Sequence, residues 1–460
     1  MPKRIAVIGA GPKGAAIAAK AGAMRLAGHP EAPMVVVYEK NQAGAAWCGR
    51  HGYTDGIQAL CTPAERDLGF PYDRVEFGGP YCAAIAQRMQ EAFSWQAFCV
   101  AQGSGSTAYE DWLLRGRKPP SHGGFVRYLD FAITRSAAGQ MAATVDRIDY
   151  LDSAGQWVVH ATDSNGTPSG DLFDAVVVTG SGPPWNALTG AGLLAHSFNS
   201  ANFWSHTNLT AIRSMLAGLA DPPGKVVIVG AGGGAAAVAQ WFVVNGLDVD
   251  ITIIGREPTL YTRRAGYFDD RLFTDIDTWK FMPLEAKRAF LRHSTAGVVW
   301  ERVLDVISQA EVNYVCADAV EVVQQSSLVA GMPPQYALKT KPVVDRERQR
   351  INRAIRRAAL PPIAASPSST SYDVDVLIDA RGFNRMAFVD DMGVDARFAP
   401  MLKTPSADVL EQFIDETLQF RLPRFPLGLH VPSLGSIQSP AATNLMALGW
   451  ISNAVLLPYC

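Results

Sequence analysis

Two glycine-rich turns are the residues of this chain whose type and spacing specify chemistry most clearly. The first turn has Gly9, Gly11 and Gly14 after an apolar run, and the second has Gly230, Gly232 and Ala235 after another. In a nucleotide-binding turn the first glycine leaves the strand tightly and the second lets the backbone approach a pyrophosphate. The third position needs a small residue so that the following helix can pack on the strand. Two such turns in strand–turn–helix context predict two dinucleotides bound by one polypeptide.

The residues after each second strand distinguish the two predicted sites. The strand that follows the first turn ends in Glu39, beside Lys40, at the spacing expected for an acid on ribose hydroxyls. The strand at 249–254 ends instead near Arg256, and Arg263 follows shortly after. A cation at this place suits a 2′-phosphate, so we interpret the first site as FAD and the second as NADPH. The alternative for each arginine is a solvated loop charge.

Bulk composition narrows the function classes. The chain has 460 residues, a net charge of −2 and a sequence pI near 6.5, so no global field favours nucleic acid or an anionic membrane. Its six cysteines show no CxxC pair and no metal-ligand spacing. The first strand begins within five residues of the start, which leaves no room for a signal peptide. These features predict a cytoplasmic enzyme that uses no metal, nucleic acid or membrane.

The order of motifs predicts an α/β fold with two Rossmann-like domains, the second inserted in the first, and a small helical substrate region. We place the first segment of the FAD domain at 1–205 and the NADPH domain at 206–374. Residues 375–460 then form the second FAD segment with part of the substrate site. Hydrophobic strands at 174–180 and 375–382 would lead the chain out of the FAD domain and back into it.

Residues 346–374 differ in composition from their surroundings. Six arginines stud residues 346–357, and a Pro/Ser/Ala-rich stretch follows. A basic helix of this kind could bind nucleic acid or a partner. We favour a solvated surface helix and a loop, because aromatic residues are not interleaved with the arginines and the chain has no overall positive charge.

Several blocks along the chain together resemble one family, the flavin-dependent N-hydroxylating monooxygenases, and most closely the lysine side-chain hydroxylases of mycobactin-type siderophore pathways. The resemblance covers most of the chain in order. Its blocks are GAGPKGAA, GAAW, DGIQALCTPAERDLGFPY, SWQAF, PPSHGGFVRYL, TLYTRRAGYFDDRLFTD and NLMALGWIS.

The resemblance implies a chemistry for both nucleotides. NADPH reduces FAD, O2 adds to form a C4a-hydroperoxyflavin, and a neutral primary amine attacks its distal oxygen to give a hydroxylamine. The implied substrate is the side-chain amine of L-lysine, with ornithine, a shorter diamino acid or another amine as alternatives. Relatives are often oligomers, so a homo-oligomer (tetramer or dimer) is also implied.

Site residues carry over from the family by position. Gln58 matches a glutamine at the flavin ring, and Ser452 matches a serine that contacts substrate. Arg66 stands where relatives have the lysine that holds the substrate carboxylate, and arginine can still bind a carboxylate. Gln240 and Asp270 stand where relatives have asparagines in the substrate site. We therefore expect Gln58 and Asp270 nearest the reacting atoms, and Arg66, Gln240, Asp270 and Ser452 around the amine substrate.

Asp270 has two interpretations. Its charge could attract a second amine or a guanidinium, although it would also raise the pKa of a nearby amine and oppose the neutral nucleophile. Alternatively it pairs with Arg271 or Arg264 and only stabilises a turn. Near the flavin, Trp47 is expected to pack under the ring or in the core, and His122 to contact the cofactor or lie in a surface loop.

Two other functions stay open from the sequence. The chain could be an NADPH–flavin oxidase or reductase that inserts no oxygen, although the missing CxxC pair disfavours the disulfide-reductase branch. It could also be a non-catalytic nucleotide-binding scaffold. Intact glycines at both turns, with Glu39 and Arg256 in place, weigh against the scaffold.

Overall fold

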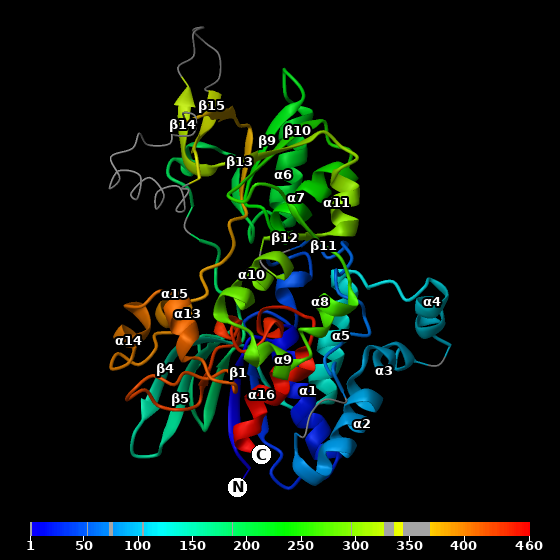
Figure 1. The fold of residues 1–460 in the computed structure, drawn as a ribbon, viewed down its shortest axis with the longest axis vertical. Coiled ribbons are helices and arrows are strands. Elements are labelled where there is room, and N and C mark those ends of the chain that lie inside the picture. The colour runs from blue at the N-terminus through cyan, green and yellow to red at the C-terminus, as the bar shows by residue number, and fades with distance from the viewer. Residues whose placement is uncertain are drawn as a thin grey trace. The chain divides into compact units, whose positions relative to one another are not determined.

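The computed structural model describes residues 2–52, 54–72, 77–103, 105–185, 187–295, 297–325, 335–343 and 369–460. The chain forms two compact units (Figure 1). Unit 1 comprises Met1–Pro183, Ala265–Thr295 and Phe383–Cys460, and unit 2 comprises Pro184–Arg264 and Ala296–Gly382.

The core of unit 1 is a parallel five-stranded sheet. Its strand order is β18-β7-β1-β2-β3, with β1 (Arg4–Ile8) in the centre, and the strands are β2 (Met34–Tyr38), β3 (Gly139–Met141), β7 (Ala175–Val178) and β18 (Leu429–His430). Both neighbours run parallel to β1, so that Ile5 pairs with Val35 on one side and Ala175 on the other. A central parallel strand is covered on both faces, which explains why β1 is a continuous apolar run.

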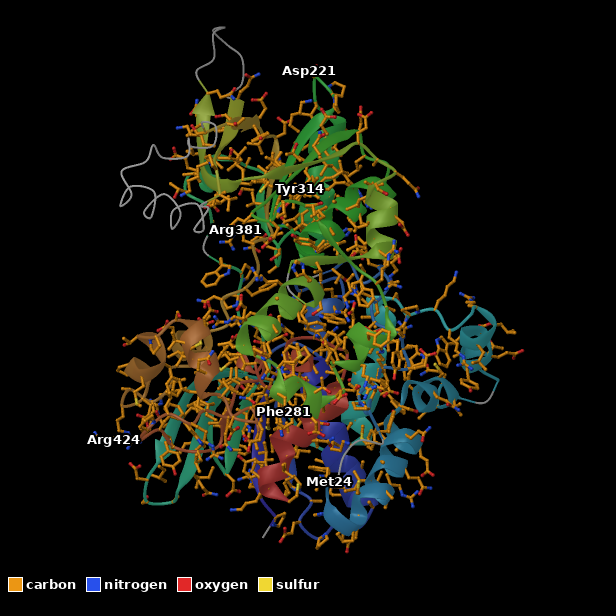
Figure 2. All side chains as sticks on the ribbon, in the orientation of Figure 1. Met24, Asp221, Phe281, Tyr314, Arg381 and Arg424 are labelled. Atoms are coloured by element: carbon orange, nitrogen blue, oxygen red, sulfur yellow. The ribbon has the colours of Figure 1, made fainter. Side chains whose placement is uncertain are left out.

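Helices cover this sheet. α1 (Pro12–Leu26) contacts α16 (Leu448–Leu456), α2 (Cys82–Phe93) and α5 (His122–Arg135), so segments far apart in the chain meet on one helix (Figure 1). The alanine-rich sequence of α1 permits these close approaches, and Met24, labelled in Figure 2, is fully buried. The remaining helices of unit 1 are α3 (Trp95–Val100), α4 (Ala108–Leu114), α8 (Tyr267–Arg271), α9 (Ile276–Phe281), α10 (Leu284–Ser294), α13 (Phe388–Asp391), α14 (Ala399–Lys403) and α15 (Ala407–Leu410), with 3-10 turns η1 (Ala45–Trp47), η2 (Gly79–Tyr81), η4 (Glu411–Phe413), η5 (Pro432–Leu434), η6 (Pro440–Thr443) and η7 (Leu457–Tyr459).

A three-stranded antiparallel meander completes unit 1. Its strands are β4 (Ala143–Leu151), β5 (Gln156–Asp163) and β6 (Pro168–Phe173), and the short turn between β4 and β5 is a tight hairpin. Trp157 is fully buried there, and its Nε1 donates to the carbonyl oxygen of Leu427 at 2.8 Å.

Unit 2 repeats the parallel arrangement. Its five-stranded sheet has the order β13-β10-β9-β17-β8, formed by β8 (Ser197–Asn199), β9 (Gly224–Val229), β10 (Val249–Gly255), β13 (Val312–Cys316) and β17 (Val376–Asp379). Among the described residues, the helices of unit 2 are α6 (His206–Ala217), α7 (Gly233–Val244) and α11 (Glu301–Ile307), with η3 (Ala191–Leu193). The pair β11 (Tyr261–Arg263) and β12 (Val298–Trp300) and the antiparallel sheet β14 (Asp318–Gln325), β15 (Gln335–Lys341) and β16 (Ser371–Asp373) complete it.

The two Rossmann-like domains predicted from the sequence are therefore present, but the chain is divided differently from the predicted boundaries. The strand at 375–382 does not return the chain to the first sheet: β17 pairs with β9 and β8 inside the second sheet. Residues 184–205 also belong to unit 2, because β8 is the outer strand of its sheet. Residues 265–295 belong to unit 1 and contribute α8, α9 and α10 to it.

Two further points complete the description. The arginines at 346–357 lie outside the described residues. Within the part of the chain that the structure describes, no helix combines the length and the apolar character that crossing a membrane requires.

Candidate functional site

The first glycine turn joins β1 to α1 with very little space. Gly9 has a φ of +103°, a conformation that side chains disfavour. A Cβ added to Gly14 would lie 2.1 Å from the carbonyl oxygen of Gly9, whereas a Cβ added to Gly11 would meet no atom within 4 Å. Gly11 is the N-cap of α1, so its missing side chain leaves the first N–H groups of the helix accessible to a ligand. This end of α1 therefore fits a pyrophosphate.

Glu39 lies at the end of β2, next to this turn. Its Oε2 accepts from the Ala10 amide at 3.0 Å, and its Oε1 accepts from the Asn41 amide at 3.0 Å. The carboxylate is thus held against the turn while each oxygen retains acceptor capacity. That arrangement fits an acid that binds ribose hydroxyls. Lys40, the next residue, is exposed.

Trp47, Gln58 and His122 are brought together beside the first turn. The Gly44 amide donates to the carbonyl oxygen of Ala10 at 2.9 Å, which joins the η1 segment to the turn. The His122 amide donates to the carbonyl oxygen of Gln58 at 2.8 Å, and the rings of Trp47 and His122 lie 5.1 Å apart. These three sequence-predicted residues are neighbours in space, and their contact with a flavin stays a prediction.

The second glycine turn joins β9 to α7. Gly230 has a φ of +129°, and a Cβ there would lie 2.3 Å from the carbonyl oxygen of Ala380. Gly232 is the N-cap of α7, again without a side chain over the helix N-terminus. Ala235 is fully buried at the third position, so this turn accommodates one methyl group. The geometry fits a second pyrophosphate.

The two candidate 2′-phosphate arginines have different environments. Arg256 follows β10 directly and is exposed. Arg263 is 4% exposed, and its guanidinium lies over the ring of Trp300 at 5.2 Å. Arg256 is therefore the better placed of the two for a ligand phosphate, while Arg263 is engaged in packing.

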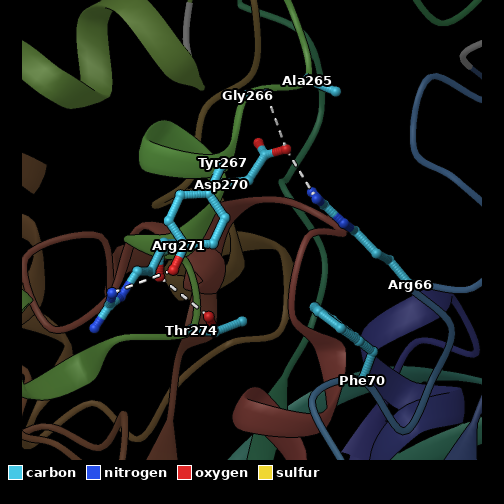
Figure 3. Close-up of a pocket in the computed structure, with 8 residues that line it drawn as sticks. All are labelled: Arg66, Phe70, Ala265, Gly266, Tyr267, Asp270, Arg271 and Thr274. Carbon is cyan, nitrogen blue, oxygen red and sulfur yellow. Dashed lines mark hydrogen bonds and ion pairs between the residues drawn. The ribbon is translucent and has the colours of Figure 1, made fainter.

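A cavity of about 430 Å³ in unit 1 joins the loop after Arg66 to the α8 segment (Figure 3). Arg66 Nη2 donates to Asp270 Oδ2 at 2.8 Å, and the Gly266 amide donates to the same oxygen at 3.2 Å. Both side chains are largely buried, at 20% and 9% exposure. The lining residues are Arg66, Phe70, Ala265, Gly266, Tyr267, Asp270, Arg271 and Thr274.

The structure gives Asp270 a partner that the sequence alternatives did not include. Its ion-pair partner is Arg66, while Arg264 pairs with Glu301 and Arg271 pairs with Asp275. The prediction that Asp270 only stabilises a turn with Arg264 or Arg271 is thus corrected to a pair that reaches across the cavity. The two charges together offer one cation and one anion to a ligand.

The other predicted substrate residues lie elsewhere. Ser452 is fully buried in α16, and its Oγ donates to the carbonyl oxygen of Gly449 at 2.9 Å. Gln240 is half-buried on α7 in unit 2. Neither residue lines the cavity, and their substrate contacts stay predictions.

Sequence reasoning missed two charged residues. Lys13 lies in the first turn of α1, at the helix end that fits a pyrophosphate, and burial together with Arg385 lowers its pKa to about 8. Asp67, next to Arg66, is 3% exposed, and burial raises its pKa to about 6 despite several hydrogen bonds. Both residues lie in sequence blocks that resemble the N-hydroxylating monooxygenases, so the resemblance pointed to these positions. No sequence pattern showed that the two side chains are buried.

Comparison with known proteins shows which solved structures share this fold. No family model matches the chain. Solved structures with this fold include lysine monooxygenase NbtG from Nocardia farcinica, with a TM-score of 0.74 and 24% identity over 99% of this chain and 100% of that one. Another is the ornithine N-hydroxylase KtzI from Kutzneria sp. 744, with a TM-score of 0.64 and 16% identity over 100% and 99%. The chain therefore shares the fold of these proteins, with two parallel sheets that each carry a glycine turn.

Sequence relatives of nearly full length share a single name. The L-lysine N6-monooxygenase MbtG of Mycobacterium sp. (strain MCS) is 28% identical over 99% of this chain and 95% of its own length. The MbtG of Mycolicibacterium paratuberculosis is 27% identical over 98% and 94%. Over nearly its whole length the chain is thus similar in sequence to L-lysine N6-monooxygenases, which supports the family resemblance carried by its motifs.

Proposed function

We propose that this enzyme uses FAD, NADPH and O2 to hydroxylate the side-chain amine of L-lysine. Per turnover, the amine, O2, NADPH and one proton give the hydroxylamine, water and NADP⁺. The full-length relatives are named L-lysine N6-monooxygenases. KtzI, which was solved with FAD, NADP⁺ and L-ornithine, has the same fold at lower identity.

The observation that carries this proposal is the charged cavity in the same unit as the first glycine turn. A dinucleotide site alone would serve any reductase. The Arg66–Asp270 pair adds a receptor for a small dipolar molecule, with a guanidinium for a carboxylate and a carboxylate for an ammonium group. An α-amino acid carries both groups at one end and leaves its side-chain amine at the other.

Bound FAD, once reduced by NADPH, supplies oxygen activation and oxygen transfer to the amine nitrogen. The chain's residues position the reactants for this chemistry. The open end of α1 would hold the pyrophosphate of FAD, and Glu39 would bind its ribose. The equivalent end of α7 would hold NADPH, with Arg256 at the 2′-phosphate.

The ion pair also bears on the protonation state of the substrate. The amine must be neutral to act as a nucleophile, and an isolated carboxylate nearby would raise its pKa. Asp270 lies 2.8 Å from Arg66, so the guanidinium offsets most of the field of the carboxylate. The cavity can therefore hold the charged end of an amino acid without stabilising the protonated form of its side-chain amine.

The decisive experiment compares amines under NADPH and O2. Purified enzyme should be yellow, and L-lysine should give hydroxylamine in near proportion to NADPH consumed. L-Ornithine tests the shorter chain, and cadaverine, the substrate named for the structural neighbour DfoA, tests the need for a carboxylate. NADPH oxidation that yields only peroxide with every amine would contradict the hydroxylase proposal and favour an oxidase.

Three finer points belong to the same proposal. None of the six cysteines, all within the described residues, forms a disulfide bond, which suits the reducing cytoplasm. A dimer or tetramer is the proposed assembly, and sedimentation of the holoenzyme would test it. An N-hydroxylated amine is the group from which hydroxamate iron ligands are built, so the product suits siderophore biosynthesis.

A further inference from the structure

Asp67 is a buried carboxylate that touches neither nucleotide turn and does not line the cavity. It follows Arg66 directly in the chain. Its Oδ1 accepts from the Tyr72 hydroxyl at 2.6 Å and from the Gly69 amide at 3.0 Å, and its Oδ2 accepts from the Trp95 amide at 2.9 Å. Two of these donors lie in the loop that carries Arg66, and the third begins α3.

The loop is also held on its other sides. The Leu68 amide donates to the Tyr128 hydroxyl of α5 at 3.2 Å, and the Gly449 amide of α16 donates to the carbonyl oxygen of Phe70 at 2.8 Å. A Cβ on Gly449 would lie 2.2 Å from the carbonyl oxygen of Gly69, so helix and loop are in direct contact. On the side of the loop that faces the cavity, the side chains of Arg66 and Phe70 line it (Figure 3).

We propose that Asp67 is the positioning residue of the substrate site: its carboxylate locks the 66–70 loop so that the Arg66 guanidinium faces Asp270 and the charged end of the substrate. This inference rests on the proposed function. It assigns Asp67 a specific task, because a displacement of the guanidinium by about 1 Å is enough to weaken productive binding strongly.

The chemistry of the anchor requires a carboxylate. Tyr72, Gly69 and Trp95 all donate to Asp67, so both of its oxygens must accept. An asparagine would present its NH2 group to at least one of these donors, whichever way the amide is turned. Burial raises the pKa of Asp67 to about 6, and the ionised form still predominates at neutral pH. A charge retained in the interior at that cost is consistent with an anchoring task.

The test compares Asp67→Asn with Asp395→Asn in the holoenzyme. Asp395 is a matched control, because it is 7% exposed in the same unit and accepts from the Tyr150 amide at 3.1 Å and the Arg397 amide at 3.0 Å, away from the cavity. We expect both variants to lower Tm. Only Asp67→Asn should raise the KM for the amine, by about tenfold or more, with the KM for NADPH unchanged.

A second variant keeps the inference testable where Asp67→Asn does not fold. Tyr72→Phe retains the ring and removes one donor, and it should raise the amine KM by a few fold. An amine KM that matches wild type in Tyr72→Phe, or moves equally in Asp67→Asn and Asp395→Asn, would overturn the positioning role. A wild-type enzyme that forms no hydroxylamine from any amine would instead refute the proposed function.

Discussion

The two glycine turns of this molecule have the same sequence pattern but differ in the space they leave for a side chain. In unit 1 a single methyl group on Gly14 would fall 2.1 Å from the Gly9 carbonyl oxygen. In unit 2 the corresponding residue is already alanine, and Ala235 is buried without conflict. The helix and strand therefore approach more closely at the first turn. The same sequence pattern thus occurs with two different distances between helix and strand.

The residues at the ends of the second strands differ in charge as well. Unit 1 places Glu39 against its turn through the Ala10 amide, whereas unit 2 places the exposed Arg256 after β10. An acid suits free ribose hydroxyls, and a guanidinium suits a ribose phosphate. This difference is consistent with the proposal that FAD binds unit 1 and NADPH binds unit 2, and the experiments below test that proposal.

The largest expected effect comes from adding a methyl group at the tighter turn. Gly14→Ala should cost about 3 kcal/mol or more of unfolding free energy and abolish flavin retention, because the clash is with backbone. Gly234→Ala in α7 is the matched control, since a Cβ there meets no atom within 4 Å. Absorbance of bound flavin and denaturant unfolding would measure both. Equal flavin content in the two variants would contradict the difference in packing.

Two buried groups in unit 1 should change its stability in opposite directions as the pH falls. Burial lowers the pKa of His430 from 6.5 to about 4, so between these values only the unfolded chain binds that proton and acid destabilises the fold. Burial raises the pKa of Asp67 from 3.8 to about 6, so there the folded chain binds the proton and acid stabilises it. Each effect amounts to about 3 kcal/mol, and in the wild type they largely cancel.

Single variants should expose each contribution. As the pH falls from 6.5 to 4, the unfolding free energy of Asp67→Asn should decrease more steeply than that of wild type. Over the same range, the unfolding free energy of His430→Gln should increase relative to that of wild type. His206→Gln, at an exposed histidine of unit 2, supplies the control substitution. Urea unfolding across this pH range measures all three. Parallel profiles for the two unit 1 variants would refute the opposing signs.

The cavity in unit 1 should govern the amine and not the nicotinamide. Arg66→Ala removes the guanidinium that pairs with Asp270, whose side chain is 9% exposed. We expect the amine KM to rise by about 10- to 100-fold, in line with the loss of a charged hydrogen-bond partner. The rate of flavin reduction by NADPH in the absence of amine should not change. An unaltered amine KM would remove Arg66 from the site.

The smallest effect is expected at the exposed arginine of unit 2. Arg256→Ala should narrow the preference for NADPH over NADH by about tenfold, because one charge-assisted contact is lost. Arg264→Ala is the control, since Arg264 is also exposed but pairs with Glu301 at 2.7 Å. Steady-state kinetics with NADPH and with NADH would measure this preference in both variants. A preference that is equal in the two variants would place the 2′-phosphate elsewhere.

The amino-acid sequence by itself determined the local devices of this protein. Glycines that need positive φ, apolar runs and the residues after each second strand are set by neighbours in the chain, and the structure confirms two parallel sheets that each carry such a turn. The blocks that resemble N-hydroxylating monooxygenases were equally visible, and the full-length relatives support them. Both kinds of signal are local patterns that survive without knowledge of long-range pairing.

Only the tertiary structure decided which distant segments meet. β17 could be recognised as a buried strand, but its place between β9 and β8 depends on pairing with residues far away in the chain. Arg66 and Asp270 are 204 positions apart, and their ion pair exists because the α8 segment belongs to unit 1. Asp67 became visible as an anchor only once its three donors were in place. Burial and pairing at long range arise from the packing of the whole unit, and no local pattern encodes them.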